Sequence, residues 1–352
     1  MPSSLSPASR PGRGIRAMVS RLSAVLLVGA ALSACTTLDD LADAPPTLTN
    51  KMVAQMRAKG MKPESPVLVR IFKQESELEI WKVDRGGSYA LLKTYPICRW
   101  SGQLGPKRKS GDRHAPEGFY QVGKGALNPK SQYYVSFNLG YPNRLERALG
   151  YTGEALMVHG ACSSSGCYAM TDQGIGEIYA IVAKALESGQ PSFQVQAYPF
   201  RMTAANMAAH RGEEDMGFWT DLKTGYDAFQ MTKREPKVSA CGGRYVFNRD
   251  FGGAEPADPL AACPPSTSTL DGALTAKLEA EQAKTAALSS GEITGSLPTT
   301  SAASAYLDGG MHPSFRALLR QKGPQKLAAS ISGTKYPISR PEAALADPFA
   351  GQ

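Results

Sequence analysis

One stretch of the sequence, MVHGACSSSGCYAM at residues 157–170, gathers residue types that can do chemistry. It holds an imidazole at His159 and thiols at Cys162 and Cys167, with glycines between them. A thiol, an imidazole and the backbone amides of a glycine-loosened loop are the parts of a cysteine acyl-transfer site. A surface loop closed by a Cys162–Cys167 disulfide would have the same composition, so these residues alone leave both interpretations open.

The segment after the stretch favours Cys167 over Cys162 as the nucleophile. Cys167 follows His159 across a Gly-Ser turn, which allows the imidazole to fold back beside the thiol. A helix is predicted to begin near Thr171, with apolar residues at helical spacing and a stop at Gly189. The partial positive charge at that helix N-terminus would lower the pKa of the Cys167 thiol.

Two other chemistries fit the stretch less well. A zinc site built from His159, Cys162 and Cys167 lacks a recognisable fourth ligand nearby, so we expect no metal and no other cofactor. A serine hydrolase is disfavoured because no Gly-x-Ser-x-Gly pattern surrounds residues 163–165. In the cysteine interpretation, the backbone N–H groups of the loop around residues 165–167 would hold the oxyanion.

Short predicted strands surround this stretch and would position it. Apolar runs bounded by Gly and Pro turns predict strands at residues 67–72, 78–83, 89–95, 119–122, 133–139, 155–159, 193–200 and 244–248. Further helices are predicted at residues 204–210 and 216–229. Many short strands with turn signals predict a mainly β domain, sandwich-like or barrel-like, with a few peripheral α-helices.

The first 34 residues are predicted to be a targeting signal. Arg21 precedes an apolar run at residues 22–31, which is too short to span a membrane as a mature helix. The following LSAC resembles a lipobox, and Cys35 would be the lipidated residue. We therefore expect a periplasmic envelope protein anchored to the outer membrane by its lipid, with plain secretion as the alternative.

The charge of the chain excludes one class of partner. The formal net charge is +8, and residues 1–34 contribute four arginines and no acid, so the remainder carries 8 − 4 = +4. This charge is mild, and no dense stripe of Lys and Arg with interleaved aromatics is present. We expect no nucleic-acid binding.

Cysteine counting points to one unpaired thiol. Removing the lipidated residue from six cysteines leaves five, an odd number in an oxidising compartment. A Cys241–Cys263 disulfide is expected to close a loop around the last predicted strand. A Cys98–Cys162 disulfide would fix the loop beside the nucleophile and leave Cys167 free, while a Cys162–Cys167 pairing stays open.

The composition divides the chain into four parts. After the signal, residues 36–65 are predicted to be a polar linker and residues 66–250 the folded domain. Beyond residue 264 the sequence turns to Ser, Thr, Ala and Pro with few aromatics. We predict a low-complexity, largely disordered tail at residues 264–352.

Several ordered motifs across residues 66–250 carry a family resemblance. They are YPIC at 95–98, SGQLGPK at 101–107, GDRHAPEGFY at 111–120, SFNLGYPN at 136–143, the opening stretch at 157–170 and PFRM at 199–202. The chain resembles the L,D-transpeptidase catalytic (YkuD-type) family of bacterial cell-wall enzymes. It is most similar to the murein L,D-transpeptidase-like branch of Gram-negative envelope proteins, whose active motif is condensed.

The resemblance assigns roles to individual residues. The family nucleophile lies in a Ser-x-Gly-Cys context and matches Cys167 with Gly166, and the family base in a His-Gly pair matches His159 with Gly160. The family fold is also a mainly β, sandwich-like domain. At two positions the chain departs from most of the family, because residue 165 is Ser instead of His and residue 169 is Ala instead of Arg.

The resemblance also implies a reaction. The Cys167 thiolate would attack the carbonyl at the L-centre of diaminopimelate in a peptidoglycan stem peptide, and an amine or water would resolve the thioester. One alternative is an amide hydrolase that releases a peptidoglycan-linked lipoprotein or outer-membrane protein, and another is a catalytically silent peptidoglycan-binding lipoprotein. The residues expected to line the oxyanion loop or the substrate groove are Gly160, Gly166, Ser165, Ser164, Asn138, Tyr141 and Asn143.

Overall fold

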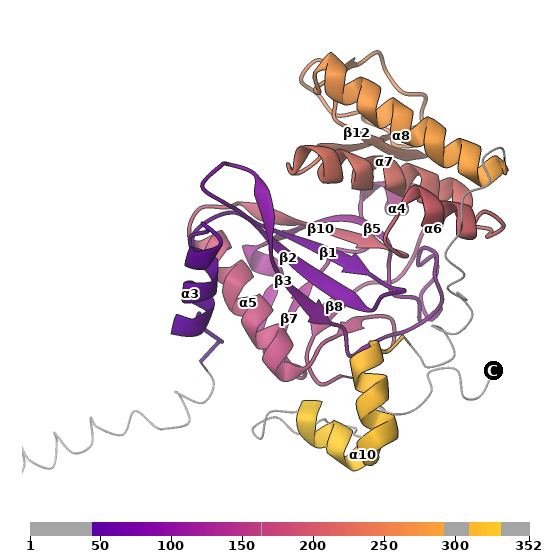
Figure 1. Cartoon of the computed structure of the whole chain (residues 1–352). Coiled ribbons are helices and arrows are strands. Elements are labelled where there is room, and N and C mark those ends of the chain that lie inside the picture. The colour runs from indigo at the N-terminus through magenta and orange to yellow at the C-terminus, as the bar shows by residue number, and fades with distance from the viewer. Residues whose placement is uncertain (1–43, 163, 292–309, 332–352) are drawn as a thin grey trace, which may run out of the picture. The chain divides into compact units, whose positions relative to one another are not determined.

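Two five-stranded sheets form the centre of the fold (Figure 1). The computed structural model describes residues 44–162, 164–291 and 310–331. The predicted signal peptide, the lipidation site at Cys35 and part of the predicted tail lie outside these ranges. Within them, no helix is both long enough and apolar enough to cross a membrane.

The first sheet mixes parallel and antiparallel pairs. Its strand order is β3 (Tyr89–Pro96), β2 (Glu77–Val83), β1 (Val67–Phe72), β10 (Ser192–Tyr198) and β5 (Gly118–Gly123). The central pair β1 and β10 is parallel, and the other pairs are antiparallel. Every residue of β1 is buried because elements cover both faces of the sheet, and all of them except Arg70 are apolar.

The second sheet contains the opening stretch of the sequence. Its order is β4 (Arg99–Trp100), β9 (Tyr168–Ala169), β8 (Met157–His159), β7 (Tyr134–Asn138) and β6 (Leu127–Ser131). Strands β8 and β9 run parallel, whereas the other pairs are antiparallel. After the loop that follows β8, the chain therefore returns to the same sheet as the short strand β9.

One hydrophobic core joins both sheets to the helix α5 (Asp172–Glu187). Val69 from β1, Val158 from β8 and Ile178 from α5 are completely buried in it. The hydroxyl of Thr171 caps the helix by accepting a hydrogen bond from the N–H of Gly174 at 3.0 Å. The helix predicted to begin near Thr171 is confirmed.

A second core covers the other face of the first sheet. It joins β5 and β10 to the helix α7 (Met216–Thr232) and to the hairpin of β11 (Val238–Cys241) and β12 (Arg244–Phe247). The prediction of a mainly β domain with peripheral helices is confirmed. The remaining short elements are η1 (Lys124–Ala126), α4 (Arg144–Ala148), α6 (Ala204–Ala209), β13 (Arg249–Asp250) and β14 (Thr267–Ser268).

The predicted linker at residues 36–65 is wrong over its second half. Residues there form α3 (Asn50–Ala58), and its Met52 and Met56 are buried in the main core together with Met61. The two helical methionines are four residues apart and so lie on one face. This sparse stripe in a polar segment is enough to pack the helix onto the domain.

The predicted tail boundary at residue 264 also needs correction. Strand β14 pairs with β13, and the helix α8 (Gly272–Ser290) packs against α6 and α7 (Figure 1). Buried Lys223 of α7 lies 3.7 Å from the Glu281 carboxylate of α8. A few such contacts order a helix whose composition alone predicts only marginal stability.

A segment near the C-terminus lies along β4. The N–H of Trp100 donates to the carbonyl of Gly310, and the N–H of His312 donates to the carbonyl of Ile97, both at 3.3 Å. The helix α10 (Pro313–Ile331) follows directly. These contacts also lie within the predicted tail.

Candidate active site

The register of β8 and β9 brings the segments that carry His159 and Cys167 side by side in the second sheet. His159 pairs with Ala169 of β9 and with Ser136 of β7. Cys167 lies in the bend directly before β9, two residues before Ala169, and its Sγ contacts the N–H of Met157 on β8. The offset along the strand is about 7 Å, at roughly 3.3 Å per residue.

The imidazole of His159 is buried beneath an exposed tyrosine. The ring centroids of Tyr133 and His159 are 4.8 Å apart, and His159 is 2% exposed. Its Nδ1 lies 2.7 Å from the carbonyl oxygen of Gly160. Burial lowers the pKa of His159 to about 4, so the imidazole is neutral at pH 7.

Cys167 carries the one free thiol among the cysteines that the structure describes. Its Sγ accepts a hydrogen bond from the N–H of Met157 at 3.4 Å, at the start of β8. Burial raises the pKa of the thiol, while this N–H and the charge of Lys107 act in the opposite direction. In the resting structure Cys167 is therefore a protonated thiol and His159 a neutral imidazole.

The expected lowering of the Cys167 pKa by a helix N-terminus is wrong. Strand β9 and Met170 separate the thiol from Asp172, the first residue of α5. Five extended residues span about 16 Å, whereas the helix charge acts within the first turn. The Asp172 Oδ1 instead accepts a hydrogen bond from the N–H of Ala161 at 2.8 Å, which anchors the loop after β8.

A disulfide joins Cys98 to Cys162 at the beginning of the loop. In this structure Cys162 is thus neither the partner of Cys167 nor a thiolate ligand for zinc. A second disulfide joins Cys241 to Cys263 beside the β11–β12 hairpin. Among the described residues, no three His, Cys, Asp or Glu side chains gather as a metal site would require.

Two hydroxyls hold the turn that presents Cys167. The Ser164 Oγ accepts from the N–H of Cys167 at 3.1 Å and donates to its carbonyl at 2.6 Å. The Ser101 Oγ accepts from the N–H of Gly166 at 2.5 Å and donates to the carbonyl of Arg113 at 2.8 Å. The predicted oxyanion donors Gly166 and Cys167 therefore already donate to hydroxyls in this structure.

Gly160, also expected at the oxyanion loop, contributes no donor there. The N–H of Gly160 donates to the carbonyl of Tyr133 at 3.0 Å, so it is engaged within the sheet. The side chain of Ser165 is exposed. Sequence reasoning missed Ser101, although the motif SGQLGPK that begins with it was part of the family resemblance.

Three of the four predicted groove residues form hydrogen bonds within the fold. The Asn143 side chain caps α4 by accepting from the N–H three residues later, at 3.0 Å. The Asn138 side chain closes a turn two residues on, at 2.9 Å. The hydroxyl of buried Tyr141 donates to the carbonyl of Lys107 at 3.1 Å. Ser164 alone of the four has a hydrogen bond to the nucleophile.

Lys107 supplies a buried cation near the thiol. It is 4% exposed, and its Nζ lies 2.5 Å from the Asp112 carboxylate. The ammonium also lies 5.9 Å from the ring centroid of Tyr141. A lysine in a loop sequence of mixed charge is expected to be a solvated charge, and the burial of Lys107 corrects that expectation.

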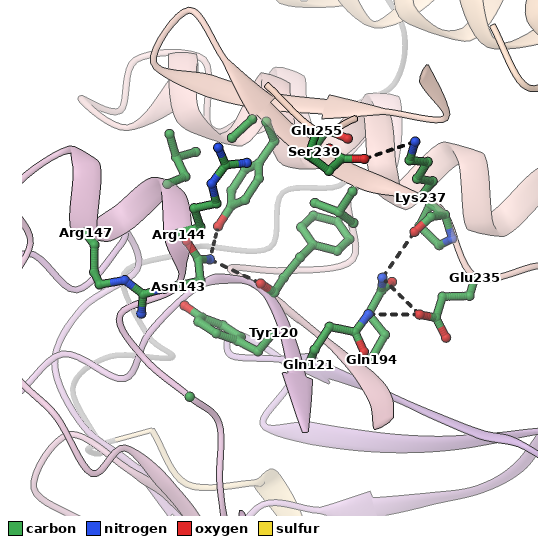
Figure 2. Close-up of a pocket in the computed structure, with 17 residues that line it drawn as sticks. Tyr120, Gln121, Asn143, Arg144, Arg147, Gln194, Glu235, Lys237, Ser239 and Glu255 are labelled. Carbon is green, nitrogen blue, oxygen red and sulfur yellow. Dashed lines mark hydrogen bonds and ion pairs between the residues drawn. The ribbon is translucent and has the colours of Figure 1, made fainter. Parts of the chain in front are cut away.

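A cavity of about 580 Å³ lies away from this chemistry (Figure 2). Its lining comes from β5, β10, α4 and the β11–β12 hairpin, and includes neither His159 nor Cys167. Arg144 and Glu235 are among its charged residues. The capping residue Asn143 also lines this cavity.

The segment that carries the free thiol and the buried imidazole lies within a match to a known domain family. A model of the L,D-transpeptidase catalytic domain (YkuD) matches residues 67–194, which include His159 and Cys167. The chain belongs to this family. It is 52% identical over 185 residues to the protein named "Putative L,D-transpeptidase YafK" of Escherichia coli K12, covering 53% of this chain and 75% of that protein. The protein of the same name in Escherichia coli O157:H7 gives the same figures.

Solved structures show only distant likeness. The helical cell shape determining protein Pgp2 of Campylobacter jejuni is 15% identical with a TM-score of 0.31, covering 67% of this chain and 77% of that one. Bd1075 of Bdellovibrio bacteriovorus is 16% identical with a TM-score of 0.28, covering 39% and 48%. Scores this low assign neither fold nor function.

Proposed function

We propose that this protein is a cysteine acyl-transfer enzyme that acts on peptidoglycan stem peptides. One observation carries the proposal: the buried, neutral imidazole of His159 ends β8, and the free thiol of Cys167 directly precedes β9, the strand paired with β8. Membership of the L,D-transpeptidase family supplies the substrate class. The remaining residues support a two-step mechanism with a thioester intermediate.

His159 is suited to act as the base. A carbonyl only accepts hydrogen bonds, so the contact with Gly160 places the proton of the neutral imidazole on Nδ1. The lone pair then lies on Nε2, which would take the proton of Cys167. No hydrogen bond joins the two described side chains in the resting structure. Catalytic contacts of this kind commonly tighten only when substrate is bound.

In the first step, Cys167 Sγ attacks the carbonyl carbon at the L-centre of a diaminopimelate residue. The thiol proton passes to His159 Nε2 and then to the leaving amine as the C–N bond breaks. Because the thiol begins protonated and the imidazole neutral, proton transfer accompanies the attack instead of preceding it. The product is a thioester on Cys167.

The oxyanion formed in this step needs donors near the sulfur. The N–H groups of Gly166 and Cys167 point to the hydroxyls of Ser101 and Ser164. Replacement of these hydroxyls by the substrate oxygen would turn the same two amides into an oxyanion hole. The hydroxyls would thus hold the amides in place until substrate arrives.

In the second step, an amine or water attacks the thioester and regenerates the thiol. An amine acceptor gives transpeptidation, and water gives amide hydrolysis, including release of a peptidoglycan-linked lipoprotein. Lipidation at Cys35 and anchoring to the outer membrane remain part of this proposal, because they would bring the domain to the peptidoglycan layer.

The test is direct observation of the thioester. Purified chain is mixed with a diaminopimelate-containing tetrapeptide donor, and intact-protein mass spectrometry follows the adduct in wild type, Cys167→Ala and His159→Gln. We expect an adduct on Cys167 in wild type, none in Cys167→Ala and much slower formation in His159→Gln. Leu149→Ala, a change at an exposed residue, serves as the matched control. Absence of the adduct, with unchanged muropeptides in cells that carry Cys167→Ala, would refute the enzyme.

A further inference from the structure

Tyr133 covers His159 with its ring. Tyr133 lies in the turn between β6 and β7 and is 39% exposed, whereas His159 beneath it is 2% exposed. Their ring centroids are 4.8 Å apart with an interplanar angle of 36°. An exposed aromatic ring that lies over a buried imidazole is a cover, because it separates the imidazole from solvent on that side.

The backbone ties this cover to the segment that carries the base. The carbonyl of Tyr133 accepts from the N–H of Gly160 at 3.0 Å, and the N–H of Tyr133 donates to the Ser131 Oγ at 3.1 Å. A Cβ added to Gly160 would lie 2.7 Å from that carbonyl oxygen. Glycine therefore permits the close approach that brings Tyr133 over the preceding residue, His159.

We propose that Tyr133 is a positioning residue that acts through His159. Its ring excludes water from the imidazole and fixes the orientation in which Nδ1 meets the Gly160 carbonyl and Nε2 keeps its lone pair. This role deepens the proposed function, since it rests on His159 being the base. The base stays neutral over a wide pH range because a charged imidazolium beneath the ring would lack solvation.

The other ionisable groups near His159 would not explain a change in its titration when Tyr133 is replaced. Asp172 of α5 uses its Oδ1 on the N–H of Ala161, and Cys167 directly precedes the neighbouring strand β9. Arg99 of β4 stands one strand beyond, with Ala169 between. None of these groups changes in a Tyr133 variant, so a change in the titration of His159 there reports on the ring.

The experiment measures the titration of His159 by NMR on the full chain. Its imidazole signal is assigned from the spectrum of His159→Gln, and titrations compare wild type, Tyr133→Ala, Tyr133→Phe and Leu149→Ala. Leu149 is 39% exposed, as Tyr133 is, which makes it the matched control. We expect a midpoint near pH 4 in wild type, Tyr133→Phe and Leu149→Ala, and a rise of at least one pH unit in Tyr133→Ala. Tyr133→Leu, which keeps an apolar cover, guards against misfolding of the alanine variant and should show a smaller rise.

An unchanged midpoint in both Tyr133→Ala and Tyr133→Leu would overturn the proposal. An equal rise in Tyr133→Phe would overturn it as well, because the hydroxyl and not the ring would then be responsible. The pH profile of thioester formation gives the second readout, and its acidic limb should move upward with the His159 midpoint. If the His159 midpoint moves but the acidic limb of thioester formation does not, Tyr133 covers His159 but His159 is not the base. That result would overturn the role of His159 in the proposed function and can be told apart from failure of the Tyr133 proposal.

Discussion

The hydroxyl of Ser101 accepts a hydrogen bond from the N–H of Gly166, a residue 65 positions further along the chain. Ser101 directly follows β4, and Gly166 directly precedes Cys167. The same hydroxyl donates to the carbonyl of Arg113. One side chain thus connects the 101–113 loop to the turn that presents the nucleophile.

Replacement of Ser101 by alanine should slow thioester formation strongly and lower the stability of the fold only slightly. The N–H of Gly166 loses its acceptor, and we expect a rate decrease of about tenfold or more, with a loss of roughly 1 kcal/mol in unfolding free energy. Acylation reactions quenched at set times measure the rate of thioester formation, and chemical denaturation measures the unfolding free energy. Ser192→Ala, which removes a hydroxyl bonded to Gln121, is the control and should leave the rate unchanged. Equal rates in both variants would contradict the role of Ser101.

Thiol counting tests the cysteine arrangement. With Cys35 replaced by serine, the native chain should react with one equivalent of a thiol reagent, at Cys167, and with five after reduction and unfolding. Loss of the Cys98–Cys162 bond, which closes 64 residues, should cost about 4 kcal/mol by the chain-entropy relation. Peptide mapping that finds a Cys162–Cys167 bond would contradict the structure.

The raised pKa of Cys167 predicts a distinct pH dependence of alkylation. The thiolate is the reactive form, and burial moves its formation above the ordinary pH range of a thiol. The rate with iodoacetamide should therefore increase about tenfold per pH unit between pH 7 and pH 9, without a plateau. A rate that levels off near pH 7 would indicate a preformed thiolate–imidazolium pair instead.

The lowered pKa of His159 predicts a loss of stability in acid. Its folded-state value of about 4 is below the ordinary value of 6.5, so the unfolded chain binds this proton more readily. The contribution of neutral His159 is present above pH 6.5 and is lost as the pH falls toward 4, by up to about 3 kcal/mol. Denaturation of wild type and His159→Gln across this range isolates the effect, since His114 and His210 also have lowered pKa values. Parallel pH curves for the two proteins would refute it.

The packing of α3 predicts that the segment before residue 66 contributes to stability. Met56 is completely buried, so Met56→Ala should cost about 2–5 kcal/mol of unfolding free energy. Lys51→Ala, on the exposed side of the same helix, should change it by less than about 0.5 kcal/mol. Thermal and urea unfolding measure both, and equal effects would show that α3 does not pack on the core in solution.

Sequence patterns predicted those parts of the molecule that local spacing determines. The strands β1 and β10 and the helices α5 and α7 follow from their apolar patterns, and α5 also has a recognisable N-cap. Contacts between segments that are distant in the sequence could not be predicted in this way. The spacing of His159 and Cys167 suggested one site, yet Ser101 and Tyr133 reach that site through pairing between strands that no local pattern specifies.

The same reason explains the errors. A helix after Cys167 suggested a lowered thiol pKa, but the intervening β9 removes the thiol from the helix end, and burial then dominates. The groove prediction for Asn143 is of a different kind: it came from a motif of the family resemblance and stays a prediction, and the structure adds that the residue caps α4. Polar residues in turns serve as caps more commonly than as ligands, and only the three-dimensional neighbours separate the two roles.

The pairing of residues 310–312 with β4 has a consequence for how the chain can be shortened. Strand β4 is the border of the sheet that carries the nucleophile, and Gly310 and His312 satisfy backbone groups of Trp100 and Ile97 there. An uncovered strand border is a template for pairing with another molecule. Truncation before residue 310 should therefore yield a protein that self-associates through β4, even though every residue proposed for the chemistry is retained.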